Sequence, residues 1–145
     1  MRVALDTNVL VSAVATRGLC ADVLQLVLAE HSPVVGGTVL AELEKVLRGK
    51  MRVPPKLVAE VVALLREECE VVKAAELLAV KIRDAADASV LAEAVAGRAE
   101  ILITGDRDLL SITVELPLQI LTPRDFWKLL RAGSADHGRS VRPIK

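Results

Sequence analysis

Aromatic side chains are almost absent from this chain of 145 residues, which contains one Phe and one Trp. Proteins that bind single-stranded nucleic acid by stacking its bases use exposed aromatic rings, so the sequence argues against that class. The formal net charge is zero, and overall charge therefore gives no sign of a nucleic-acid partner. No apolar stretch approaches the roughly 20 residues of a membrane span. The N-terminus is a poor signal peptide, because Asp6 interrupts its apolar run. We expect a cytoplasmic protein with no membrane partner.

Clustered cysteine and histidine are also missing. Cys20 and Cys69 lie among aliphatic residues without the spacing of metal ligands, and we expect small buried thiols in a reducing compartment. Aliphatic residues are abundant instead: hydrophobic residues make up 52% of the chain, and most are Val, Leu and Ala. This composition favours an α/β core built from Val/Leu strands and Ala/Leu helices.

Short apolar runs alternate with helical patterns along the chain. Strands are predicted over residues 2–5, 34–35, 70–72, 100–103 and 118–121. Helices are predicted over residues 8–14, 19–30, 39–47, 56–68, 88–96 and 123–130, with a helical turn at 108–110 and a helical or irregular segment at 74–82. Thr38 is predicted to cap the third helix and Gly97 to close the fifth in a left-handed conformation. The alternation predicts a parallel sheet covered on both faces, in one domain over residues 1–131 with a polar, disordered tail at 132–145.

Several carboxylates stand at the ends of these elements. Asp6 follows the first strand, Asp106 and Asp108 follow the fourth, Asp87 begins a helix, and Glu42 lies on the helix after the second strand. The carboxyl ends of parallel strands share one edge of a sheet, where ligands bind. Taken singly, each acid also fits a plainer role as a helix cap, a turn residue or an exposed helix residue.

Convergence of these acids predicts a metal site. Two carboxylates 4 Å apart repel by about 4 kcal/mol at an effective dielectric constant of 20, so a cluster that stays ionised needs a cation. Oxygen ligands without clustered His or Cys suit Mg²⁺ or Mn²⁺ rather than Zn²⁺. Such an ion activates water and orients phosphate. Asn8 and Thr104 are candidates for orienting a phosphate or the nucleophile.

A basic segment follows the third helix. It carries no acid between residues 45 and 56 and has a local charge of +5 from Lys45, Arg48, Lys50, Arg52 and Lys56. Lys45, Arg48, Lys50 and Arg52 are candidates for contacts with RNA phosphates. A solvated helix face is the alternative interpretation.

Four short motifs together resemble the PIN-domain family. They are Asp6-Thr7-Asn8 after an apolar strand, Glu42 after a short strand, Asp84-x-x-Asp87 before an Ala/Leu helix, and Ile-Thr-Gly-Asp-x-Asp-Leu-Leu at residues 103–110. The resemblance covers about residues 2–130. The sequence Pro-Arg-Asp-Phe from Pro123 also resembles the close of a prokaryotic subgroup, the VapC-like toxins of toxin–antitoxin pairs.

The resemblance implies a PIN-like three-layer α/β/α fold with a five-stranded parallel sheet in the order 3-2-1-4-5. It implies a Mg²⁺- or Mn²⁺-dependent endoribonuclease that cleaves RNA through a metal-activated water, a small antitoxin partner, and a homodimer. The family's metal-binding acids carry over to Asp6, Glu42, Asp87 and Asp106, and Asp108 matches an accessory position. The subgroup has a denser Asp-Pro-Asp-Asp run where this chain has Asp84-Ala-Ala-Asp87, which leaves open whether Asp84 or Asp87 is the ligand.

Two other functions fit parts of the pattern. One is a Mg²⁺-dependent phosphatase with Asp6 as nucleophile, although such enzymes generally have a second Asp where this chain has Asn8. The other is a PIN fold that binds RNA or protein without catalysis.

Overall fold

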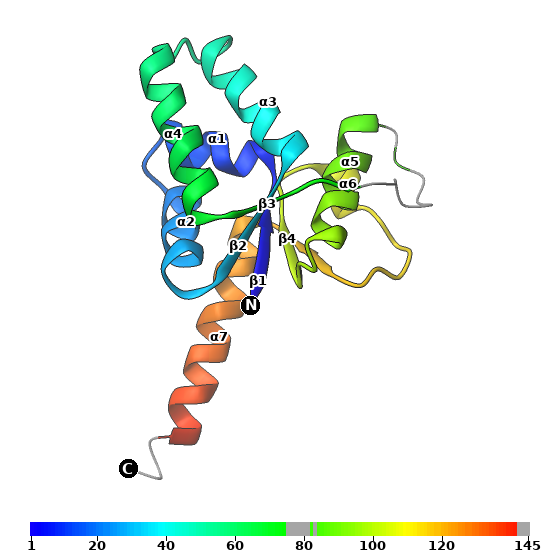
Figure 1. Cartoon of the computed structure of the whole chain (residues 1–145). Helices are drawn as coiled ribbons and strands as arrows, with labels where there is room; N and C mark the ends of the chain where they lie inside the picture. The colour runs from blue at the N-terminus through cyan, green and yellow to red at the C-terminus, as the bar shows by residue number, and fades with distance from the viewer. Residues whose placement is uncertain (75–81, 83, 142–145) are drawn as a thin grey trace.

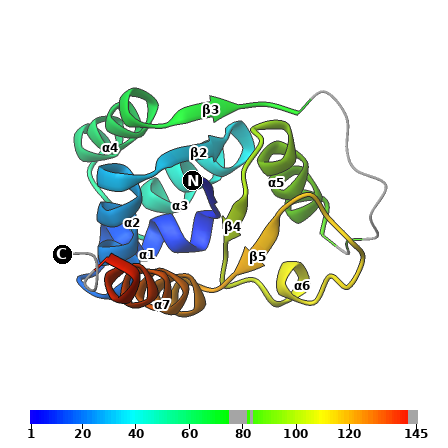
Figure 2. The same ribbon diagram turned by 90° about the horizontal axis from the view of Figure 1, so that it is seen from below.

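The computed structural model describes residues 1–74, 82 and 84–141. Its strands form one parallel sheet in the order β3-β2-β1-β4-β5, as predicted (Figures 1 and 2). The predicted segment 74–82 lies almost wholly outside the described residues. The elements in chain order are β1 (Arg2–Leu5), α1 (Thr7–Ala15), α2 (Leu19–Glu30), β2 (Ser32–Gly36), α3 (Gly37–Arg48), α4 (Pro55–Glu68), β3 (Glu70–Val72), α5 (Ala85–Ala96), β4 (Ile101–Ile103), α6 (Arg107–Leu110), β5 (Gln119–Leu121) and α7 (Pro123–Val141).

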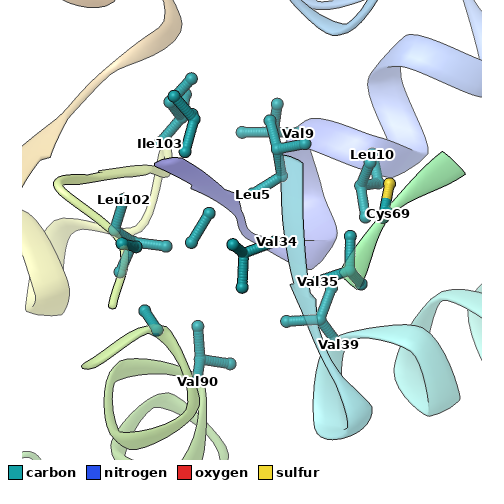
Figure 3. Close-up of a cluster of buried hydrophobic side chains, with 14 of the residues drawn as sticks. Leu5, Val9, Leu10, Val34, Val35, Val39, Cys69, Val90, Leu102 and Ile103 are labelled. Carbon is teal, nitrogen blue, oxygen red and sulfur yellow. The ribbon is translucent and has the colours of Figure 1, made fainter. Parts of the chain in front are cut away.

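Helices cover both faces of the sheet. α2 and α7 lie on one face and α5 lies on the other, which gives three layers (Figure 2). The central strands are accordingly apolar on both sides, and Leu5, Val34 and Leu102 are each at most 1% exposed. They pack with residues of α1, α3 and α5 in one core (Figure 3). This two-sided burial explains why the strands are continuous apolar runs rather than alternating ones.

The register of the two central strands positions the carboxyl edge of the sheet. Leu5 of β1 lies opposite Ile103 of β4, and the Asp6 N–H donates to the Ile103 carbonyl at 3.0 Å. The residues that follow these strands, Asp6 and Thr104, therefore lie beside each other. α1 and α3 continue from the same edge (Figure 1).

The N-terminus of α3 is capped differently from the prediction. Gly36, not Thr38, is the N-cap residue, and it has no side chain to accept a hydrogen bond. A buried carboxylate from α5 takes that role: Glu93 accepts from the Thr38 N–H at 3.0 and 3.3 Å. The anion also suits the positive end of the helix dipole. A contact between residues 55 positions apart in sequence thus replaces a local cap.

Gly97 does not adopt the predicted left-handed conformation. Its φ is −78°, and the following residue, Arg98, has the positive φ of 57°. Close packing requires a glycine at position 97 instead, because a Cβ there would lie 2.6 Å from Cγ1 of the fully buried Val34.

Two further boundaries differ from the sequence prediction. β2 is longer than predicted and begins at Ser32; Pro33 pairs with β1 before β3 joins the ladder at Val34. The last helix was predicted to end at residue 130, but α7 continues to Val141. Both cysteines are free thiols: Cys69 is buried and Cys20 is half-buried.

In the described part of the chain, no single helix has the length and hydropathy of a membrane span. Only α1 and α2 taken together reach those values, across a bend of 105°.

Two glycines provide a test of this packing. We expect Gly97→Ala to lower the free energy of unfolding by about 1–3 kcal/mol, because the added methyl group overpacks the core beside Val34. Gly133→Ala is the matched control, since nothing lies within 4 Å of its Cβ position in α7. That variant should be neutral or more stable by about 0.5–1 kcal/mol through its higher helix propensity. Urea denaturation measures both, and equal effects of the two substitutions would contradict the packing argument.

Candidate metal centre at the carboxyl edge

The ends of β1 and β4 are joined by one buried hydroxyl. Thr104 Oγ1 donates to Asp6 Oδ2 at 2.6 Å and accepts from the Asp106 N–H at 2.9 Å. From the sequence, Thr104 is predicted to orient a phosphate or the nucleophile. In the structure it is fully buried, and both of its hydrogen bonds are directed at the two acidic residues. Thr104 therefore positions Asp6 and the turn that carries Asp106.

Asp6 is a helix cap and part of the acidic cluster at once. Its Oδ1 accepts from the Thr7 N–H at 2.7 Å, so it caps α1, and the side chain is 5% exposed. Burial raises the pKa of Asp6, with smaller contributions from the charges of Asp106 and Glu42; the hydrogen bonds from Thr104 and Thr7 act in the opposite direction. The two interpretations of Asp6 offered by the sequence are thus compatible.

The helix α5 separates the roles of Asp84 and Asp87. Asp84 is the N-cap and accepts from the Ala86 N–H at 2.7 Å. Asp87 lies in the first turn and lines the pocket beside Asp6 and Asp106. Burial and the neighbouring carboxyl of Asp106 raise the pKa of Asp87 to about 7, with Asp84 and Asp6 adding to the shift. Of the two, only Asp87 lines this pocket and belongs to a set of acids that could hold a metal ion.

Asp106 and Asp108 begin the short helix α6. Asp106 is its N-cap and accepts from the Asp108 N–H at 2.8 Å. Asp87, Asp106 and Asp108 can each offer an oxygen within 4.8 Å of the other two. This set of three hard oxygen donors, crowded enough to disturb a pKa, fits Mg²⁺ or Mn²⁺.

Glu42 reaches the same place from α3. It is exposed, and its Oε2 accepts from Thr7 Oγ1 at 3.3 Å. A pocket of about 360 Å³ connects these groups, which we call the acidic pocket; it is lined by Asp6, Thr7, Asn8, Val11, Ser12, Glu42, Val46, Asp87 and Asp106. The structure therefore brings together the four predicted acids, with Asp108 beside them.

Asn8 lines this pocket, and its side-chain oxygen is already hydrogen-bonded within the protein. Its Oδ1 accepts from the Gly105 N–H at 3.2 Å, which ties α1 to the turn after β4. Thr7 and Ser12 also line the pocket, and neither was predicted as a site residue from the sequence. The signal for Ser12 was its position four residues after Asn8, on the same face of α1.

The structure places the four predicted basic residues in different surroundings. Arg48 forms an ion pair with Glu44 at 2.9 Å on its own helix. Arg52 lies in the α3–α4 connection with a φ of 49°. Lys45 and Lys50 alone among the four line a second pocket, which adjoins the acidic one at Glu42 and Val46.

The raised pKa of Asp87 makes the stability of the metal-free protein depend on pH. Between the ordinary value of 3.8 and about 7, the folded protein holds a proton that the unfolded chain has released. Stability therefore falls as the pH rises through this window. Because Asn carries no charge, we expect the stability of Asp87→Asn relative to the parent to increase from pH 5 to pH 8. Urea denaturation in chelator measures this, with Asp125→Asn, an exposed residue of α7, as the control. A difference that stays constant with pH would contradict the assignment.

The fold has counterparts among solved structures. One is the crystal structure of VapBC2 from Rickettsia felis bound to a DNA fragment from their promoter. It matches with a TM-score of 0.60 and 17% identity over 83% of this chain and 97% of the other. Another is VapBC-1 from nontypeable Haemophilus influenzae, with a TM-score of 0.62 and 21% identity over 86% and 99% of the two chains. At these identities the likeness concerns the fold.

A comparison with curated proteins finds no match. The sequence model of the PIN domain, by contrast, matches residues 2–108. That range contains β1 to β4 and every acid of the site. With this match over most of its length, the chain belongs to the PIN-domain family.

Proposed function

We propose that this PIN domain is a Mg²⁺- or Mn²⁺-dependent endoribonuclease that hydrolyses phosphodiester bonds to 5′-phosphate and 3′-hydroxyl ends. One observation carries the proposal: carboxylates from α3, α5 and the ends of β1 and β4 line a single open pocket. Two of them, Asp87 and Asp106, can each offer an oxygen within 4.8 Å of the other and of an oxygen of the adjacent Asp108. So much negative charge in one place cannot bind a phosphate without a cation.

In this proposal the residues in and around the pocket have different roles. Asp87 and Asp106, with Asp108, would hold the metal. The buried Asp6 would add negative charge beside them, and the exposed Glu42 would accept hydrogen bonds from water at the rim of the site. A bound divalent ion would activate water and stabilise the leaving oxygen. The Asn8 amide would donate to a phosphate oxygen. Thr104 keeps Asp6 and Asp106 at a fixed spacing, which is the preorganisation that such a site needs.

The phosphatase alternative fits this geometry less well. A nucleophilic Asp6 would need a free oxygen directed at the substrate. Both Asp6 oxygens instead accept hydrogen bonds, from the Thr7 N–H and the Thr104 hydroxyl, and the side chain is 5% exposed.

Cleavage of RNA tests the proposal directly. Purified protein should cut an unstructured RNA with Mg²⁺ or Mn²⁺ and not with chelator. Asp106→Asn should lower the rate by more than the roughly 10–100-fold that loss of an outer-shell partner costs. Asp22→Asn, an exposed acid of α2, should cut like the parent. RNA that binds but stays intact with every metal would favour the non-catalytic binding module instead.

We further propose that the chain is the toxin of a toxin–antitoxin pair, acts in the cytoplasm and has a small antitoxin protein as its partner. Support comes from the likeness of its fold to the two VapBC structures. A homodimer is proposed through α4, where Leu57 and Leu64 are 48% and 51% exposed and lie seven residues apart on one helix face. The mass of the protein in solution tests the dimer.

Induced expression in bacteria tests the toxin role. We expect the parent chain to stop growth, because uncontrolled RNA cleavage halts protein synthesis, and we expect Asp106→Asn to permit growth at the same protein level. Growth curves with immunoblots measure this. Normal growth with active, soluble parent protein would point to a nuclease outside any toxin–antitoxin pair.

A further inference from the structure

A second pocket adjoins the acidic pocket at the start of α3 and the α3–α4 connection. It has a volume of about 640 Å³ and we call it the lysine pocket. Its walls are mostly small or aliphatic, from Thr38, Ala41, Val46, Gly49 and Ala86, and its two cations are Lys45 and Lys50. The volume is in the range of pockets that hold small organic groups.

The two pockets are continuous along one face of α3. Glu42 and Val46 line both of them, and they are one helical turn apart. A ligand that places a phosphate at the acids of the first pocket can therefore extend directly into the second. The α3 helix, which lines both pockets, is held at its N-terminus by the hydrogen bond from the Thr38 N–H to Glu93.

The charge of the lysine pocket favours a ligand with an anionic part. Within residues 1–74, 82 and 84–141, Lys45 and Lys50 make no ion pair, whereas the nearby Arg48 is paired with Glu44. The wall formed by Ala41, Val46 and Ala86 offers no charge and favours an apolar surface. A nucleotide combines both properties, since its base has apolar faces and its phosphate is an anion.

We propose that the lysine pocket binds the base of one unpaired nucleotide adjoining the scissile phosphate, while Lys45 and Lys50 contact its phosphate. The proposal rests on the ribonuclease function proposed above. Burial between aliphatic side chains would replace aromatic stacking, for which the sequence offers only one Phe and one Trp. A base held in a duplex cannot enter such a pocket, so the enzyme prefers single-stranded RNA.

Two separate changes test the proposal: an abasic nucleotide removes the base from the RNA, and a larger side chain fills the pocket of the protein. The scissile bond of a short unpaired RNA is first mapped with the parent protein. A series of RNAs then carries one abasic nucleotide at each position in turn. We expect one position beside the scissile bond to lower kcat/KM by about tenfold, at the low end of what one bound base contributes, while distant positions have little effect.

Ala41→Leu fills the pocket without removing an acid or a lysine. This variant should cut intact RNA about tenfold more slowly than the parent does. It should cut the sensitive abasic RNA as fast as the parent does, because the substitution and the removal of the base abolish the same contact. Ala59→Leu, an exposed alanine of α4, should leave both rates unchanged. Lys50→Ala should slow intact and abasic RNA equally, because the phosphate is present in both.

Other outcomes overturn the proposal. If the parent cleaves all abasic RNAs at the same rate, no base is held in the pocket. If Ala41→Leu slows cleavage of the sensitive abasic RNA by the same factor as it slows cleavage of intact RNA, the base is bound elsewhere. Loss of antitoxin binding by Ala41→Leu with unchanged base dependence makes the pocket a protein docking site. If the parent cuts no RNA, the ribonuclease proposal fails. Fluorescence anisotropy then measures the affinity of the protein for each RNA of the series, and equal affinities for all of them, or no binding, would reject the proposal that the pocket binds a base.

Discussion

Mutual repulsion among carboxylates is the constraint around which this structure is arranged. Asp6, Asp87 and Asp106 lie in one pocket, and each stands at the beginning of a helix: α1, α5 and α6. The N–H groups and dipoles at these helix starts offset part of the negative charge. The offset is incomplete, because the pKa of Asp87 still rises to about 7. In the function proposed above, a divalent cation would supply the remaining neutralisation.

The parallel sheet makes this convergence possible. β1 and β4 are adjacent in the sheet although nearly 100 residues separate them in sequence, and their register places Asp6 beside Thr104. The Thr104 hydroxyl then contacts both Asp6 and the turn that carries Asp106. The acids thus stand on strand ends and helix starts, with buried partners behind them, rather than on free loops. Such support is what holds a catalytic group in position.

Local patterns in the sequence were sufficient to predict the acids that line the pocket. The strand order was predicted through the family resemblance that those patterns carry. Apolar runs mark buried strands, and a charged residue after such a run marks the strand's end. What could not be predicted depends on contacts between distant residues. Gly97 is a glycine because of Val34, α3 is capped by Glu93 rather than Thr38, and Thr104 is fully buried between Asp6 and the turn that carries Asp106. No local pattern carries that information.

The cap of α3 has an evolutionary consequence. Gly36 is bare because Glu93 occupies its side-chain space: a Cβ at Gly36 would lie 3.0 Å from the Cβ of Glu93. Two solutions can therefore satisfy the Thr38 N–H, a glycine with a distant glutamate, or a local Ser or Asp cap with a small residue on α5. A lineage that changes one position alone either clashes or loses a hydrogen bond. Across relatives, positions 36 and 93 should therefore covary, and that pairing would identify sequences in which α3 is fixed to α5 in this way.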